Sequence, residues 1–233
     1  MSGLKTESAV AFVKRGLTAT ADPEKAAGMQ AYMKTDMPFY GVQKPGRTKI
    51  FRHVRTEYAP TTREEYEDLV TALWELPHRE EKYLAQAFAG AFRDFIVPES
   101  LPLYRRFIVE GAWWDFVDES ATHLVRPLVI HYPDEIWPEV DSWIDHDDMW
   151  LRRAAIICQV GAKEQTDADR LFRYCEKRAH EKEFFIRKAI GWALRDYAKT
   201  EPEAVARFAS EHRAELSGLS FREATKHIGE LVQ

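Results

Sequence analysis

Residues 149–156 read MWLRRAAI, and residues 184–191, 35 positions later, repeat the pattern as FFIRKAIG. Residues 83–88, YLAQAF, match residues 150–155 at a shift of 67 positions. Aromatic residues near the expected helix starts recur at spacings of 31, 36, 35 and 36, at Tyr83, Trp114, Trp150, Phe185 and Phe221. A period in the mid-thirties within a helical chain is typical of a helical-hairpin solenoid. We therefore predict an all-α, curved solenoid with a concave groove, and a helical bundle with chance similarity is the alternative.

Helical patterns cover almost all of the 233 residues. Long alternating β-branched runs and Asn-Gly or Asp-Gly hairpin turns, which would indicate strands, do not occur. Capping residues, early acids and Pro in the first turn mark helix starts near residues 22–24, 61–65, 132–135, 166–167 and 200–203. Because no Gly/Ser-rich linker interrupts the chain, we expect a single domain over residues 1–233.

Charge is distributed unevenly along the chain. The formal net charge of −5 argues against a generic nucleic-acid binder. Residues 37–56 nevertheless carry a charge of +5, and residues 149–163 and 184–195 carry +3 each, with no acidic residue in any of these windows. This segregation permits a basic face on an acidic body. Ordinary solvated helix faces are the alternative explanation.

Several classes of protein find no support in the sequence. No apolar run of about 18 residues occurs, and the N-terminus lacks an apolar signal core, so we expect a cytoplasmic protein. We expect Cys158 and Cys175 to be reduced, buried thiols, because they form no CxxC motif. His146, Asp147 and Asp148 resemble metal ligands, but Asp148 is well placed to cap the next helix. Without a P-loop, GxGxxG, GxSxG or HExxH motif, we expect no metal and no cofactor.

Residues 111–118, GAWWDFVD, contain the candidate functional site. Neighbouring residues on a helix point about 100° apart. Projection at this angle predicts a core-facing stripe at Trp113, Val117, Ser120 and Leu124. The same projection predicts a solvated face at Asp115, Glu119 and Thr122. Trp114 and Asp118 fall between these faces, one turn apart and within reach of each other. An indole beside a carboxylate at the border of a buried face is unusual for packing alone.

Two consecutive arginines differ in their expected surroundings. With Trp150 as the origin, Arg152 projects beside Gln159 on a solvated face. Arg153 projects between Ile157 and Val160, inside an apolar stripe near a helix N-terminus. A cation there is poorly placed for burial and for the helix dipole, so it needs an anionic partner. The sequence leaves two candidates for this partner, a carboxylate of the protein and a bound phosphate.

A basic stripe follows in the next matching segment. Arg187, Lys188, Gly191 and Arg195 project together, and Trp192 lies at the margin of this stripe. We expect Gly191 to leave open backbone beside the indole. A basic stripe edged by an aromatic ring suits a phosphate backbone with the ring against a sugar or base. A half-buried Trp at a helix boundary is the alternative.

These motifs together resemble the AlkD-type DNA alkylation repair family. The resemblance rests on WWDFVD at residues 113–118, WLRRAAI at 150–156 and EFFIRKAIGW at 183–192, with AYMK at 31–34 and FYGVQKP at 39–45. It implies a concave, basic solenoid of HEAT-like repeats and a glycosylase that removes cationic N3- and N7-alkylated purines from duplex DNA. It also implies that Asp118 is the catalytic carboxylate, Trp114 and Trp192 are aromatic walls, and Arg153 is a phosphate-side arginine.

The resemblance and the charge pattern together define the expected partner, alkylated double-stranded DNA. Residues expected to contact it are Tyr32, Gln43, Lys44, Arg47, Arg152, Arg187, Lys188 and Arg222. Phe221 departs from the family pattern, which often has a basic residue there. We predict that the enzyme is a monomer and that it does not bind a membrane. A non-enzymatic HEAT-repeat scaffold that binds structured or damaged DNA, and a protein–protein adaptor, are the alternatives.

Overall fold

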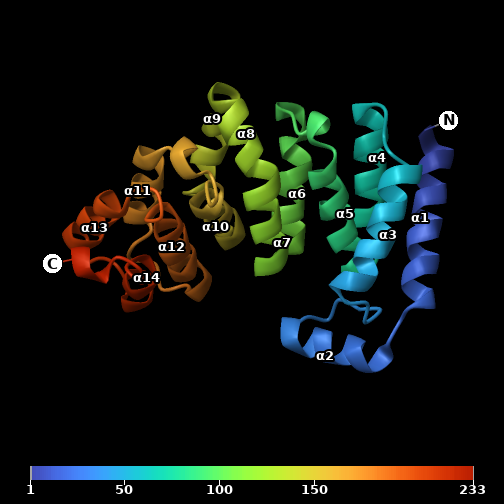
Figure 1. Ribbon diagram of the computed structural model, residues 1–233, viewed down its shortest axis with the longest axis horizontal. Coiled ribbons are helices and arrows are strands. Elements are labelled where there is room, and N and C mark those ends of the chain that lie inside the picture. Colours follow the sequence, from blue (N-terminus) through green and yellow to red (C-terminus); the bar gives the residue numbers. More distant parts are fainter. Residues whose placement is uncertain (1, 233) are drawn as a thin grey trace. The chain divides into compact units, whose positions relative to one another are not determined.

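A computed structural model describes residues 2–232 of the chain. Its contacts divide the chain into two compact units, Met1–Ile96 and Val97–Gln233. Within residues 2–232 no residue lies in a strand, which confirms the all-α prediction (Figure 1). HEAT-like repeats contact mainly their neighbours in sequence. Two compact units are therefore compatible with the single domain that we predict over residues 1–233.

The first unit consists of helices joined by short connections. They are α1 Ser2–Ala19, α2 Pro23–Met33, α3 Lys44–Glu57, α4 Arg63–Trp74, α5 Arg79–Ala91 and the 3₁₀ turn Arg93–Phe95. The predicted starts of α2 and α4 are confirmed, because the side chains of Asp22 and Thr62 accept hydrogen bonds from Lys25 N and Glu65 N. Tyr66, Leu73 and Trp74 of α4 are almost fully buried. The core of this unit therefore lies where α4 packs against α1 and α5.

The second unit continues the series of helical hairpins. Its α-helices are α6 Leu101–Gly111, α7 Trp114–Glu119, α8 Arg126–His131, α9 Pro133–Trp143, α10 Met149–Ile157, α11 Ala168–Lys177, α12 Phe184–Tyr197, α13 Pro202–Glu211 and α14 Gly218–Ala224. A π-helical segment, Ser120–Val125, joins α7 to α8. Short 3₁₀ turns occur at Pro98–Ser100, Lys163–Gln165 and Gly229–Leu231.

The aromatic series predicted from the sequence marks the second helix of successive hairpins. Tyr83, Trp114, Trp150, Phe185 and Phe221 lie in α5, α7, α10, α12 and α14. Each of these helices contacts the helix before it in its own hairpin, α4, α6, α9, α11 or α13. Within the second unit α7 also contacts α10, α10 contacts α12, and α12 contacts α14. This ladder confirms the HEAT-like repeat, whereas the curvature and the concave basic groove stay predictions.

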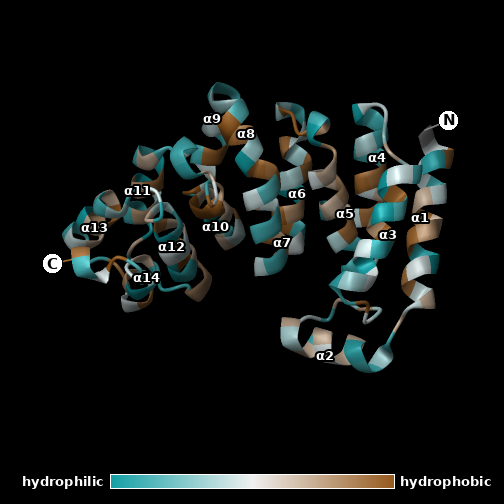
Figure 2. Cartoon of the chain, in the orientation of Figure 1, coloured by the Kyte–Doolittle hydropathy of each residue, from teal (hydrophilic) through white to brown (hydrophobic). Residues whose placement is uncertain are grey.

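Burial in both units follows the apolar faces of these helices. Figure 2 shows hydrophobic and hydrophilic residues alternating along individual helices. Cys158 and Cys175 are buried free thiols, as predicted. Among the residues that the structure describes, no helix is both long and apolar enough to cross a membrane.

Candidate functional site

Arg153 joins three helices of the second unit at one point. Its Nε and Nη2 donate to Oδ1 and Oδ2 of Asp118 in α7, both at 2.8 Å. Its Nη1 donates to the carbonyl oxygen of Phe185 in α12, at 2.6 Å. The requirement for an anion near Arg153 is therefore met by a carboxylate of the protein, and the cation is not directed at an external phosphate. The forked contact fixes the orientation of the carboxylate as well as its position.

Asp118 is enclosed but still reachable from solvent. Its side chain is 19% exposed, against 6% for Arg153. Burial raises the pKa of Asp118 above its usual 3.8, the Asp115 charge adds to the increase, and Arg153 acts in the opposite direction. The carboxyl therefore ionises less readily than a surface aspartate. Each of its oxygens has a second lone pair that the fork leaves for another ligand.

Aromatic rings pack beside this ion pair. Trp113 lies 5.9 Å from Trp150 and 5.5 Å from Phe185, measured between ring centroids. The prediction that Trp113 belongs to the buried helical stripe is wrong, because it is the extended N-cap of α7 and only half-buried. Val117, the next member of that stripe, is fully buried, as are Ser120 and Leu124. Trp114, the first residue of α7, and Trp192 of α12 are half-buried.

The helix that carries Asp118 widens directly after it. Residues Ser120–Val125 form a π-helix, and Pro127 follows. Pro127 has no N–H to offer the carbonyl of His123 four residues earlier, which accounts for the wider turn. A projection at 100° per residue drifts in such a segment, so Thr122 is buried at 6% exposure and not solvated as predicted. Its hydroxyl donates to the backbone carbonyl of Asp118 at 2.7 Å.

The other two members of the predicted solvated face differ from each other. The Glu119 side chain is 45% exposed, in line with the prediction. Asp115 is half-buried. π-Helical turns occur frequently at functional sites. Asp118 lies two residues before this widened segment.

Contrary to the prediction, Arg152 does not face solvent. Its Nε and Nη2 donate to the carboxylate of Glu181 at 2.9 and 3.1 Å. Its Nη1 donates to the carbonyl oxygens of His146 and Asp147, both at 2.8 Å. Gln159, which was expected beside Arg152 on the solvated face, is only 6% exposed. Its side-chain amide donates to the backbone carbonyl of Asp167 and accepts from the backbone N–H of the same residue. Arg152 therefore ties α10 to the α11–α12 connection and has little capacity left for a ligand.

The basic stripe of α12 is largely neutralised by α14. Lys188 donates to Glu223 Oε1 at 2.9 Å, and Arg195 forms an ion pair with the other carboxylate oxygen. Gly191 does not expose open backbone, since a Cβ there would collide with Glu223. Arg187 is half-buried, forms no ion pair with any residue from 2 to 232, and has a buried Nε without a hydrogen-bond partner. Of the stripe, only Arg187 remains available to an anion.

In the first unit, the expected DNA-contacting residues lie on α2 and at the start of α3. α2 has no buried residue, and Tyr32 on it is 73% exposed. Gln43 is the N-cap of α3 and, like Lys44, is exposed. Arg47 donates from Nη1 to Val42 O at 3.0 Å and lies over the Tyr83 ring.

A buried glutamate that the sequence did not single out holds the segment between α2 and α3. Glu80 of α5 is fully buried and accepts the backbone N–H groups of Tyr40, Gly41 and Val42 at 3.0, 2.8 and 3.0 Å. Gly41 has a φ of +86°, and a Cβ there would collide with the carbonyl oxygen of Asp22. This clasp fixes the connection from which α2 and α3 both project. In the sequence, Glu80 looks like an ordinary acidic residue near the start of a helix, and nothing else there indicates this contact.

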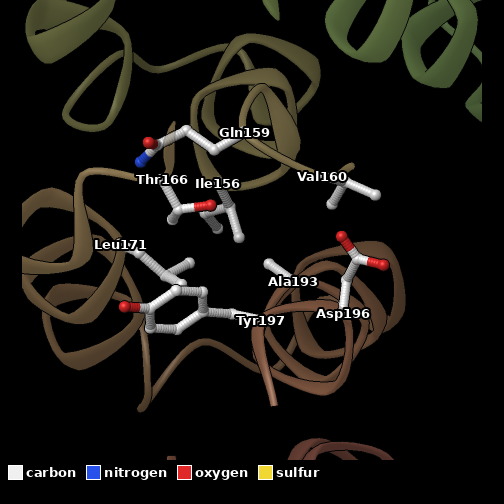
Figure 3. Close-up of a pocket in the computed structure, with 8 residues that line it drawn as sticks. All are labelled: Ile156, Gln159, Val160, Thr166, Leu171, Ala193, Asp196 and Tyr197. Atoms are coloured by element: carbon white, nitrogen blue, oxygen red, sulfur yellow. The ribbon is translucent and has the colours of Figure 1, made fainter. Parts of the chain in front are cut away.

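The weaker motifs have structural roles. Asp148 caps α10 by accepting from Trp150 N at 2.7 Å, and His146 Nδ1 accepts from Asp148 N at 2.9 Å. Among residues 2–232, no group of three or more His, Cys, Asp or Glu side chains could hold a metal ion. A small pocket lies between α10 and α12 (Figure 3), lined by residues such as Ile156, Ala193 and Tyr197. Asp118 and Arg153 do not line it.

Comparison with known proteins places these features in a family context. A family model described as DNA alkylation repair enzyme matches residues 13–228. A solved structure of a predicted DNA alkylation repair enzyme from Enterococcus faecalis is 30% identical, with a TM-score of 0.78, over 90% of this chain and 97% of that chain. The crystal structure of AlkD2 from Streptococcus mutans shares the fold at 17% identity, with a TM-score of 0.63, over 87% of this chain and 99% of that one. A search of curated proteins finds no match.

Proposed function

Because the chain belongs to the DNA alkylation repair enzyme family, we propose that it is a DNA glycosylase. It hydrolyses the N-glycosidic bond of positively charged N3- or N7-alkylated purines in duplex DNA. The observation that carries this proposal is the oriented carboxylate of Asp118, held by Arg153 and reachable from solvent. Asp118, Trp114 and Trp192 are the side chains that the reaction below uses, together with a water molecule.

The chemistry needs an anion more than it needs an acid. An N-alkylated purine already carries a positive charge, so it departs as a neutral base without protonation. Breaking the bond develops oxocarbenium character on the deoxyribose. The ionised Asp118 stabilises this charge and orients the water that attacks the sugar carbon, as carboxylates do in glycosidases. The π faces of Trp114 and Trp192 add roughly 0.5–2 kcal/mol each toward the same cation.

Arg153 acts in this proposal as a positioning residue. Its donors serve Asp118 and the Phe185 carbonyl, so it holds α7 and α12, the helices that carry the two tryptophans, against α10. A fixed carboxylate costs no reorganisation when charge develops on the sugar. The Thr122 hydroxyl supports the same geometry through the Asp118 carbonyl.

DNA contacts in the proposal come from both units. We keep Tyr32, Gln43, Lys44, Arg47, Arg187 and Arg222 as the residues that bind DNA. We leave out Arg152 and Lys188, because Glu181 and Glu223 already neutralise them. The partner is alkylated duplex DNA.

The test measures release of alkylpurines from methylated duplex DNA. Asp118→Asn should abolish release while DNA binding persists. Glu119→Gln is the matched control, because it removes a carboxylate from the same helix whose side chain is 45% exposed, and it should behave like the wild type. Release by Asp118→Asn at the wild-type rate rejects the role of Asp118. DNA binding by the wild type without any release favours the non-enzymatic scaffold.

A further inference from the structure

The last helix of the chain sorts its charges onto two faces. In α14 the carboxylate of Glu223 is directed at α12, where Lys188 and Arg195 neutralise it. Ser220 on the inner side donates its hydroxyl to the Arg187 carbonyl at 3.0 Å and is fully buried. Glu223, the acidic residue of α14, is therefore paired with cations inside the second unit. Arg222 is the charged side chain that α14 leaves exposed.

The outward face of α14 and its flanking turns carry exposed cations. Arg222 is exposed, and so are Arg213 in the turn before α14 and Lys226 in the turn after it. Among residues 2–232, none of the three forms an ion pair. Glu215, two residues after Arg213, has its Oε2 3.8 Å from Nδ1 of His212.

Arg213 is held in place by an aromatic ring. Its guanidinium carbon lies 4.2 Å from the ring centroid of Phe221. A guanidinium stacked on a ring keeps its charge and most of its N–H donors free, and it loses less conformational entropy when it binds an anion. Arg222 follows Phe221 directly and reaches back to Gly218, where its Nη1 lies 3.3 Å from the position that a Cβ would take. One guanidinium group therefore lies over the Phe221 ring and the other beside Gly218, one turn before Arg222.

We propose that this face, formed by Arg213 on Phe221 together with Arg222, binds the phosphate backbone of duplex DNA. The proposal deepens the proposed function, on which it rests, and it assigns Arg213 and Phe221 a role that the sequence did not predict. Guanidinium forks match phosphate oxygens in geometry and charge. The surface contacts no base and contributes affinity without sequence preference. Phe221, which departs from a basic family pattern, serves here as the support for a cation from the neighbouring turn.

The experiment measures binding of the full chain to a short, unmodified, fluorescein-labelled duplex by anisotropy, between about 50 and 200 mM salt. Each phosphate contact contributes about −0.9 to the slope of log K against log salt concentration. Arg213→Ala and Arg222→Ala should each reduce the slope by about 0.9. Arg207→Ala is the matched control, since this exposed arginine of α13 lies between Glu203 and Glu211, four residues to either side. It should leave the slope unchanged.

The role of the ring is tested separately. Phe221→Ala should weaken DNA binding in the wild-type background and have no further effect in the Arg213→Ala background. Circular dichroism checks that the helices remain folded. Wild-type slopes in both arginine variants, with intact binding by the wild type, overturn the α14 surface and leave the glycosylase proposal standing. No salt-dependent binding by the wild type overturns both.

Discussion

Replacing Arg153 by Met separates the positioning of Asp118 from the chemistry that Asp118 performs. Met keeps much of the aliphatic length of the side chain but removes three hydrogen bonds, two to Asp118 and one to the Phe185 carbonyl. Asp118 then remains largely buried without its cation. Removing one partner of a buried ion pair typically costs about 3–5 kcal/mol, because the other charge is left uncompensated.

The magnitude expected here is smaller than the full range. The Asp118 side chain is 19% exposed, so water can solvate part of the unpaired carboxylate. We expect the free energy of unfolding to fall by about 2–3 kcal/mol. In a chain of this size, that corresponds to a decrease in melting temperature of about 4–12 °C. Thermal and urea unfolding followed by circular dichroism measure both quantities.

The pH dependence gives a second readout that a purely structural defect does not move. Burial already raises the pKa of Asp118 above 3.8 in the wild type. Base release requires the ionised carboxylate, so its rate should fall as the pH drops through this raised pKa. Arg153 lowers the pKa, and its removal should therefore shift the acid limb of the rate profile further upward.

A double variant isolates the coupling between the two residues. With Asp118→Asn, no charge is left stranded, so Arg153→Met should cost at least 1 kcal/mol less than it does alone. Leu151→Ala is a suitable control, because Leu151 is a fully buried neighbour in α10. It should reduce stability without moving the acid limb. Equal costs of Arg153→Met in both backgrounds, together with an unchanged acid limb, would refute the positioning role.

Three further predictions concern other contacts. Glu80→Gln places an amide N–H₂ group against three backbone N–H groups that now donate to the carboxylate. We therefore expect faster hydrogen exchange at Tyr40, Gly41 and Val42 and weaker DNA binding. The single-turnover rate at saturating DNA should not change. Gly41→Ala should destabilise the first unit by more than about 1 kcal/mol, because Gly41 has a φ of +86° and a Cβ there would collide with Asp22. Gly28→Ala is the control, because Gly28 lies in an exposed helix with open space around it, and this change should be neutral or stabilising. Chemical denaturation measures both free energies of unfolding. Glu223→Gln frees Lys188 and Arg195 from their shared carboxylate, so DNA should bind more tightly and with a steeper salt dependence; unchanged binding would contradict the neutralisation of the α12 stripe.

The repeat was predictable from the sequence because it depends on spacing alone. Aromatic residues at regular intervals identified the second helix of each hairpin, and the capping residues located where several helices begin. The need of Arg153 for an anion was also predictable, because a cation within an apolar stripe cannot remain unpaired. Helical projection treats each helix in isolation, however, so it could not say that Asp118 is the partner.

A signal for these pairings was present in the repeat period. Asp118 and Arg153 are 35 residues apart, and so are Lys188 and Glu223. In a solenoid, equivalent positions of consecutive repeats lie side by side, so opposite charges one period apart are candidates for ion pairs. The position of Thr122 carried no such signal, because the π-helical turn changes the angle per residue. The Glu80 clasp depends on the path of a connection that has no periodicity.

The pairing of charges also limits which cations of this chain, with its net charge of −5, the proposed DNA contacts can use. In the second unit, carboxylates neutralise Arg152, Arg153, Lys188 and Arg195 within the fold. In this unit the two proposals rely on Arg187, Arg213 and Arg222 to bind phosphate. The salt dependence of binding reports the number of phosphates contacted and not the total positive charge. A modest slope carried by a few arginines is consequently expected, and each of those arginines should account for a measurable share of it.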